Sequence, residues 1–464
     1  MSEARAGAAA PEDLAALESL EAELDERWPE TRIEPSLTRI AALMDLLGSP
    51  QRAYPTIHVA GTNGKSSVCR MADALLTRMH MRVGRTTSPH LQSVTERIAI
   101  DGEPISPAGY VRTYRDIEPY VQMVDDSSVA AGGPRMSKFE VLTAMAFAAF
   151  ADAPVDVGVI ETGLGGRWDA TNVIDSQVAV ITPIGLDHAE YLGTEITGIA
   201  GEKADIIKST SVAVLSEQRP EVSEVLLRRA VEVDAAVARE GSEFAVLERR
   251  TAVGGQMLRI QGLGGVYDDV FVPLHGEHQA HNAALALAAV EAFFGAGKDR
   301  KLDDDAVREG FATLVNPGRL EPVRTAPSVF IDAAHNPHGA RALAAALSGE
   351  FHFRRLVGVV AIMADKDVRG ILEALEPVFD ELVVTHNGSP RCMSPAQLSE
   401  LAADVYGDDR VHVAQSLPAA LESAVELAEE VSGPGEEISG SGVVITGSVV
   451  TAGLARTMLG KEPT

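Results

Sequence analysis

Four short apolar runs recur along the first half of the chain, at residues 56–61, 155–161, 177–182 and 212–215. They are rich in β-branched side chains and are apolar on both faces, as in strands buried within a parallel sheet. Helical spacing separates them, for example in KFEVLTAMAFAAFA at residues 138–151. This alternation predicts an α/β fold built on a parallel sheet.

A different pattern follows between residues 240 and 275, where apolar and polar positions alternate and glycines interrupt the runs. It predicts a small antiparallel patch. Proline and glycine then cluster in NPGRLEP, which we interpret as a hinge. A second strand–helix series predicts a Rossmann-like, doubly wound α/β domain, although without a dinucleotide-binding fingerprint. The predicted organisation is a disordered lead-in (1–15), a first domain (16–315), the hinge (316–322) and a second domain (323–464).

The composition narrows the class of protein. A chain of 464 residues is expected to form at least two domains. No stretch reaches the roughly 20 apolar residues of a membrane span. The acidic N-terminus lacks the features of a secretory signal, so we expect a cytoplasmic protein without a membrane partner. Cys69 and Cys392 form neither a disulfide framework nor a metal cluster. A formal charge of −27 argues against nucleic-acid partners.

The segment HVAGTNGKSSVCRMADALL begins as a strand, turns through glycines and continues as a helix. Gly61 and Gly64 let backbone N–H groups turn towards a phosphate, and Lys65 can reach its terminal oxygens. Ser66 and Ser67 can each offer a hydroxyl to Mg²⁺. The generic P-loop pattern is matched only in its second half, so a plain strand-to-helix turn is the alternative.

Magnesium bound with phosphates takes one or two carboxylates, so an acidic residue should end a neighbouring strand. Glu161 ends the run at 155–161, and a solvated strand end is its alternative interpretation. His188 follows another run and could ligate a second cation, orient a substrate or be structural. Lys203 lies on a predicted helix, and by itself it indicates only a solvated surface lysine.

Nine segments resemble, in order, the motifs of folylpolyglutamate synthase and dihydrofolate synthase in the Mur ligase superfamily. They are HVAGTNGKSS, TTSPHLQSVTERIAIDG, SKFEVLTAMAF, ETGLGGRWDATN, ITPIGLDHAEYLG, GEKADIIK, NPGRLE, DAAHNPHGA and MADKD. The resemblance implies a P-loop ATP-binding first domain and a second domain, both of Mur ligase type. It also implies a bifunctional ATP-dependent ligase that joins L-glutamate to dihydropteroate and to reduced folates through an acyl phosphate.

The resemblance further implies roles for residues at matching positions. ATP would be bound by Gly61, Thr62, Asn63, Gly64, Lys65, Ser66, Ser67, Asn282, Arg319 and Asp332. Two Mg²⁺ sites would use Ser66 or Ser67, Ser88, Glu161, His188 and Lys203, with Lys203 carbamylated and therefore anionic. The residues expected at the reaction centre are Lys65, Lys203, His188 and His335.

The pterin side is implied by three further segments. They contain Glu34, Pro35, Ser36, Leu37, Ser137, Lys138, Phe139, Glu140, Trp168, Asp169 and Ala170. Phe139 can stack on a flat ring, although its helical neighbours are equally typical of a core position. Ser66 stands where the family commonly has glycine, and Trp168 where it often has an aliphatic residue. The alternatives are folylpolyglutamate synthase activity alone, another Mur-type ligase, or a nucleotide-dependent switch. The resemblance suggests a monomer.

Overall fold

The computed structural model describes residues 10–27, 36–186, 193, 195–295, 297, 300–430 and 440–464. The first helix, α1 (Pro11–Asp25), starts with proline and packs its leucines against the long helix α4 (Pro107–Ala130). One prediction is thereby corrected, because the disordered lead-in expected up to residue 15 is helical from Pro11. Proline is well suited to this first position, since its missing N–H would have no partner there.

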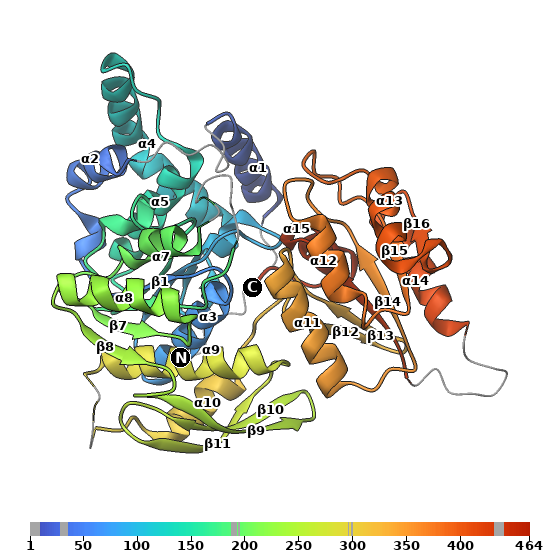
Figure 1. Cartoon of the computed structure of the whole chain (residues 1–464). Coiled ribbons are helices and arrows are strands. Elements are labelled where there is room, and N and C mark those ends of the chain that lie inside the picture. The colour runs from blue at the N-terminus through green and yellow to red at the C-terminus, as the bar shows by residue number, and fades with distance from the viewer. Residues whose placement is uncertain are drawn as a thin grey trace.

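The N-terminal lobe, from α1 to α10, is built around an eight-stranded sheet (Figure 1). Its order is β4-β3-β2-β5-β1-β6-β7-β8, parallel from β2 to β8 and antiparallel at the β3 and β4 edge. Its strands are β1 (Thr56–Ala60), β2 (Val83–Thr86), β3 (Ile98–Ile100), β4 (Glu103–Pro104), β5 (Val157–Glu161), β6 (Val178–Ile181), β7 (Val212–Leu215) and β8 (Ala236–Arg239). The four strands predicted from apolar runs are confirmed as β1, β5, β6 and β7, and β1, β5 and β6 are buried along their whole length.

Helices cover both faces of this sheet. One face packs on α3 and α9, and the other on α5, α7 and α8. The remaining elements of the lobe complete these layers: α2 (Thr38–Leu46), η1 (Pro50–Arg52), α3 (Lys65–Arg78), η2 (Val94–Arg97), α5 (Lys138–Asp152), η3 (Ala170–Val173), α7 (Ile196–Ala204), α8 (Pro220–Glu232), α9 (Glu277–Phe293) and α10 (Asp304–Ala312).

A three-stranded antiparallel sheet lies on the far side of α9, at the bottom of Figure 1. It consists of β9 (Ala245–Ala252), β10 (Gly255–Gln261) and β11 (Val266–Val272). Its buried side chains, including Leu258 and Val270, join the same core as α3 and α9. The small antiparallel patch predicted for residues 240–275 is therefore confirmed.

The C-terminal lobe, from β12 to α15, contains a six-stranded sheet of order β12-β13-β17-β14-β15-β16. The helices α11, α12 and α13 pack on one face and α14 and α15 on the other, which confirms the doubly wound prediction. The elements are β12 (Glu321–Thr325), β13 (Ser328–Ile331), α11 (Pro337–Glu350), β14 (Arg355–Val360), α12 (Val368–Leu375), β15 (Glu381–Val384), α13 (Pro395–Tyr406), η4 (Asp408–Arg410), β16 (Val411–Val413), α14 (Leu417–Glu429), β17 (Ser441–Thr446) and α15 (Val449–Met458). Only β12 is antiparallel, and it begins at Glu321, within the expected hinge.

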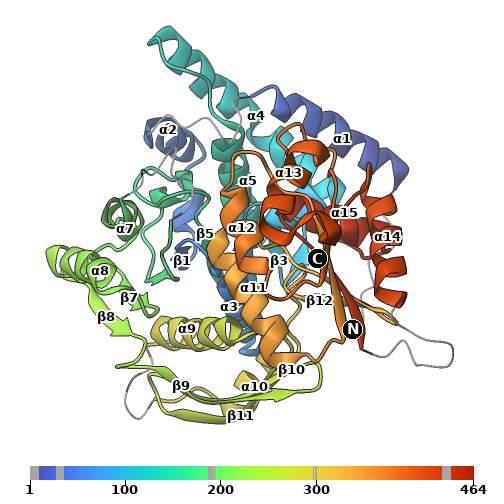
Figure 2. The same cartoon turned by 45° about the vertical axis from the view of Figure 1, so that its right-hand side comes forward.

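The loops that follow β1 and β13 meet where the two lobes face one another. Asn63 and Asn336 exchange side-chain hydrogen bonds across this boundary, at 3.4 and 3.1 Å. In both views α11 runs beside α9, so the C-terminal lobe also covers the end of that helix (Figures 1 and 2). No helix in the described part of the chain combines the length and apolar character needed to cross a membrane.

Candidate active site

The glycine-rich turn after β1 passes very close to two neighbouring elements. A Cβ atom at Gly61 would lie 1.8 Å from the Thr182 hydroxyl, and one at Gly64 would lie 2.6 Å from the Asn282 side chain. Both glycines also have positive φ values, of 147° and 88°. Only glycine fits these two positions, and the turn therefore delivers its backbone to the N-terminus of α3, where N–H groups can bind phosphate.

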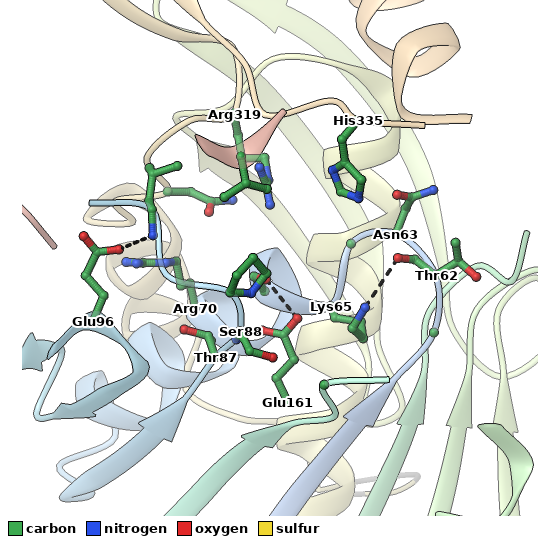
Figure 3. A pocket seen from close by; sticks show the side chains of 18 of the residues that line it. Thr62, Asn63, Lys65, Arg70, Thr87, Ser88, Glu96, Glu161, Arg319 and His335 are labelled. Atoms are coloured by element: carbon green, nitrogen blue, oxygen red, sulfur yellow. Dashed lines mark hydrogen bonds between the residues drawn. The ribbon is translucent and has the colours of Figure 1, made fainter. Parts of the chain in front are cut away.

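Two residues on α3 and two at neighbouring strand ends meet beside this turn (Figure 3). The Ser66 hydroxyl donates to one oxygen of Glu161 at 3.0 Å, and the backbone N–H of Ser88 donates to the other at 3.3 Å. Burial raises the pKa of Glu161, although the charge of Lys65 and these hydrogen bonds oppose the rise. Lys65 extends along the turn and reaches the Thr62 carbonyl at 3.4 Å. The group combines oxygen ligands with a cation.

The two adjacent serines have different environments. Ser67 is buried, and its hydroxyl accepts a hydrogen bond of 2.9 Å from Asn316, which belongs to the segment between the lobes. Ser66 instead faces Glu161. The structure therefore separates two residues that sequence reasoning left as equal candidates, and only Ser66 lies with the carboxylate.

Lys203 is buried on α7, and its ammonium donates to the Gly61 carbonyl at 2.8 Å. Gly166, in the loop after β5, allows this approach, because a Cβ there would lie 2.5 Å from the Glu202 carbonyl. The interpretation of Lys203 as a solvated surface lysine is wrong, since tight loop packing brings it under the phosphate-binding turn.

His188 lies outside the described residues. Within the described ranges, no cluster of three or more His, Cys, Asp or Glu side chains forms a complete metal cage. Magnesium needs fewer protein ligands than such a cage, because phosphates and water fill its remaining positions. The oxygens of Ser66 and Glu161 match that preference.

These residues line a cavity of about 150 Å³ formed by both lobes. From the N-terminal lobe come the glycine-rich turn, Ser88, Glu161 and Lys203, and from the other side come Arg319 and His335. A second cavity of about 350 Å³ lies between α9 and α11 and shares Arg319 and His335. It includes apolar surface from Leu285 and Leu343 beside polar groups, as expected for a pocket that takes a flat heterocycle. All ten residues expected to contact ATP line one cavity or the other.

The residues expected from the hinge and second lobe are held by backbone contacts. Asp332 accepts hydrogen bonds from the N–H groups of Leu320 and Ala334, at 2.9 and 2.8 Å. Burial raises its pKa, which the charge of Arg319 opposes. Leu320 has a φ of 44°, a left-handed conformation that a leucine rarely adopts. His335 donates from Nδ1 to the Ala333 carbonyl at 3.0 Å.

The segments expected on the pterin side come together, but their polar atoms are bonded within the lobe. Ser137 and Glu140 form a capping box on α5, and Glu140 also pairs with Arg39 on α2. Lys138 pairs with Glu21 and Asp25 on α1, at 2.8 and 2.7 Å. Ser36 accepts from the Thr38 N–H, and Leu37 packs into the core, whereas Glu34 and Pro35 lie outside the described residues.

The remaining pterin-side residues lie around the loop after β5. The ring of Phe139 is partly buried against Gly163, where a Cβ would lie 2.4 Å from the ring tip. Asp169 is buried and accepts from Leu164 and Thr171, so it shapes the loop. Ala170 is buried, and Trp168 is 48% exposed. None of these residues lines the two cavities, although Gly163 and Leu164 line the smaller one.

Sequence reasoning missed several residues of the smaller cavity, among them Arg70, Thr87, Glu96 and Asn316. Arg70 carried one usable signal, because it follows Lys65 on the same helix and is basic in an acidic chain. It also missed the contact of Asn63 with His338, at 2.7 Å. That contact joins two motifs 275 positions apart and has no local sequence signal.

Comparisons with known proteins extend this picture. Residues 133–290 match the Mur ligase middle domain, and residues 318–449 match the Mur ligase glutamate ligase domain. The Mycobacterium tuberculosis dihydrofolate synthase/folylpolyglutamate synthase is 64% identical over 98% of this chain and 96% of its own length. The Bacillus subtilis protein of the same name is 35% identical over 81% of this chain and 84% of its own length.

Solved structures agree. Mycobacterium tuberculosis folylpolyglutamate synthase complexed with ADP superposes with a TM-score of 0.93 at 63% identity, covering 97% of this chain and all of that chain. An Escherichia coli relative in complex with DHPP and ADP superposes with a TM-score of 0.81 at 29% identity, covering 97% of this chain and 99% of that chain. This chain therefore belongs to the dihydrofolate synthase/folylpolyglutamate synthase family and is built from Mur ligase domains.

Proposed function

We propose that the protein is an ATP-dependent ligase that adds L-glutamate to 7,8-dihydropteroate and to the γ-glutamyl tails of tetrahydrofolate. The observation that carries this proposal is the cavity in which the glycine-rich turn, Lys65 and Glu161 face Arg319 and His335. Such a cavity supplies cations and N–H donors from two lobes to one phosphoryl group. The names and bound ligands of the related proteins support the same conclusion.

Magnesium fits the residues present. Ser66 and Glu161 would hold one ion, with the Ser88 loop beside them, because oxygen ligands next to a phosphate site suit Mg²⁺. When bound, magnesium neutralises charge on the phosphates. We propose a second site that uses His188 and a carbamylated Lys203, in keeping with the family resemblance.

The chain's own residues would act by positioning and charge. The acid substrate's carboxylate attacks the γ-phosphorus, ADP leaves, and the amine of glutamate then displaces inorganic phosphate from the acyl phosphate and loses a proton. Lys65 and the N–H groups of the turn stabilise negative charge on the transferring group. Closure of the lobes brings Arg319 and His335 to this centre and excludes water that would hydrolyse the acyl phosphate.

Carbamylation of Lys203 is testable by itself. A buried ammonium is costly, and a carbamate would replace it with an anion that still has an N–H for the Gly61 carbonyl. With ¹³C-bicarbonate, the wild-type protein is expected to give a carbamate signal in ¹³C spectra, and Lys203→Arg is expected to lack it. Lys203→Ala should lose most turnover while it still binds ATP. Full turnover of that variant in bicarbonate-free buffer would contradict the role.

The activity is tested by incubating purified protein with ATP, Mg²⁺, L-glutamate and either dihydropteroate or a tetrahydrofolate. We expect ADP and a product one glutamyl residue heavier in both cases. Product from the tetrahydrofolate alone would reduce the proposal to folylpolyglutamate synthase activity. ADP release with neither acceptor would remove it in favour of another Mur-type ligase. We also propose a cytoplasmic monomer, which gel filtration and fractionation would test.

A further inference from the structure

Buried arginines in this protein pair with carboxylates. The pairs join Arg85 to Asp73 at 2.8 Å, Arg27 to Asp125 at 2.9 Å and Arg39 to Glu140 at 3.1 Å. Such pairing offsets the cost of removing a charge from water. An enclosed guanidinium without a carboxylate therefore indicates a binding position for an anion.

Arg70 is such a residue. It lies on α3, five positions after Lys65, and this spacing corresponds to about 7.5 Å along the helix axis. It lines the smaller cavity and forms no ion pair within the described part of the chain. One of its N–H groups donates to the backbone carbonyl of Thr464 at 2.6 Å, which leaves other donors of the guanidinium for the cavity.

The nearest acid does not neutralise Arg70. The carboxylate of Glu96 accepts backbone hydrogen bonds from Leu91, Gln92 and Ser93, at 2.8, 3.0 and 3.1 Å. Burial lowers the pKa of Arg70 to about 9, and the charge of Glu96 opposes that decrease, so the side chain stays cationic at neutral pH. Figure 3 shows Arg70 and Glu96 at one end of the cavity and Lys65 at the other, with Glu161 between them.

The two ends of the cavity suit different anions. The Lys65 end lies at the glycine-rich turn and suits the phosphates of ATP. The segments expected to hold the pterin reach the cavity at Gly163, against which Phe139 packs. The Arg70 end is closed by Asn316, Pro317 and Val449 from the other side of the lobe boundary, and this end remains for the amine donor.

We propose that Arg70 binds a carboxylate of the incoming L-glutamate and thereby directs its amine towards the centre of the cavity. This inference rests on the proposed ligase function, since it concerns the amino acid that the ligase consumes. The strongly negative surface of the protein makes a local cation necessary for a dianionic substrate.

The test compares Arg70→Gln and Arg70→Lys with wild type in steady-state kinetics, varying L-glutamate, ATP and the pteroate in turn. Loss of a charged hydrogen bond should raise KM for L-glutamate about 10- to 100-fold in Arg70→Gln. Arg70→Lys should recover part of that loss, and KM for the other two substrates should stay within about 2-fold. Arg78→Gln is the matched control, because Arg78 lies on the same helix and pairs at the surface with Glu309.

Two glutamate analogues identify the carboxylate. L-Glutamine lacks the γ-carboxylate and L-isoglutamine lacks the α-carboxylate. Wild type should discriminate against one of them, and Arg70→Gln should lose that discrimination specifically. Each variant is first checked for wild-type thermal unfolding and for stabilisation by ATP, and Arg70→Lys serves alone if Arg70→Gln fails that check.

An unchanged KM for L-glutamate, or an increase confined to ATP or the pteroate, would overturn the assignment. A decrease in kcat alone would also overturn it. Failure of the proposed function gives a different result, because wild type would then consume no ATP with L-glutamate and any pteroate acceptor.

Discussion

In the glycine-rich turn, the polar atoms of Lys65 and Ser66 face a cavity shared by both lobes. In the segments expected to hold the pterin, Ser137, Lys138 and Glu140 instead bond to one another or to α1 and α2. Both sides carry family motifs of similar polarity. The difference indicates that the motif residues on the phosphate side contribute to turnover, whereas many on the pterin side contribute to the shape of the lobe.

The largest expected effect is on the phosphate side. Lys65→Ala should lower kcat by about 10²- to 10³-fold, because one preorganised donor to the transferring phosphoryl group is removed. Thermal unfolding should stay close to wild type, since Lys65 makes only a 3.4 Å contact with the Thr62 carbonyl. Turnover within a few-fold of wild type would contradict the comparison.

The opposite result is expected for Glu140→Ala. It removes half of a capping box and leaves Arg39 without its buried partner, so the free energy of unfolding should fall by about 3 kcal/mol. Denaturant unfolding measures this, and turnover per folded molecule should change little. Glu118→Ala is the control, because Glu118 pairs with Arg115 at the surface and should cost about 0.5 kcal/mol or less.

The adjacent serines sharpen the comparison within one helix turn. Ser66→Ala should raise the Mg²⁺ concentration needed for half-maximal activity about 10-fold, since its hydroxyl lies with Glu161. Ser67→Ala should leave that concentration unchanged, because its hydroxyl bonds to Asn316. Magnesium titrations of both variants check this, and equal shifts would mean that the two environments do not divide the roles.

The smallest effect concerns His58, which connects the two sides. It lies in β1 just before the turn, and its ring bonds to the Thr171 hydroxyl at 2.8 Å. Burial, followed by the charge of Lys208, lowers its pKa to about 3. The unfolded imidazole takes a proton below about pH 6.5, so stability present above that pH is lost as the pH falls. Between pH 7 and 5.5 this loss is about 1 kcal/mol.

Urea unfolding of wild type and His58→Gln at both pH values measures this contribution. The variant should lose less stability than wild type over the same interval, whatever its absolute stability. Identical losses would show that His58 does not titrate as its burial implies.

The strands around the turn were predictable because burial on both faces leaves a local signal, as in β1 and β5. The edge strand β12 left none, since Glu321–Thr325 is short, largely solvent-facing and contains proline. The choice between Ser66 and Ser67 depended on Asn316, which is 249 positions from Ser67. The burial of Lys203 depended on Gly166 and on the turn above it. Such facts arise from long-range packing and not from local pattern.

The paired amides of Asn63 and Asn336 fix the angle at which the lobes meet. Each side chain both donates and accepts, so the two groups must stay nearly coplanar to keep both bonds. A small rotation of one lobe breaks both at once, and the next residue, Pro337, has no backbone N–H to replace them. The boundary therefore works as an alignment pin, and the lobes can separate or dock in register but cannot slide gradually past one another.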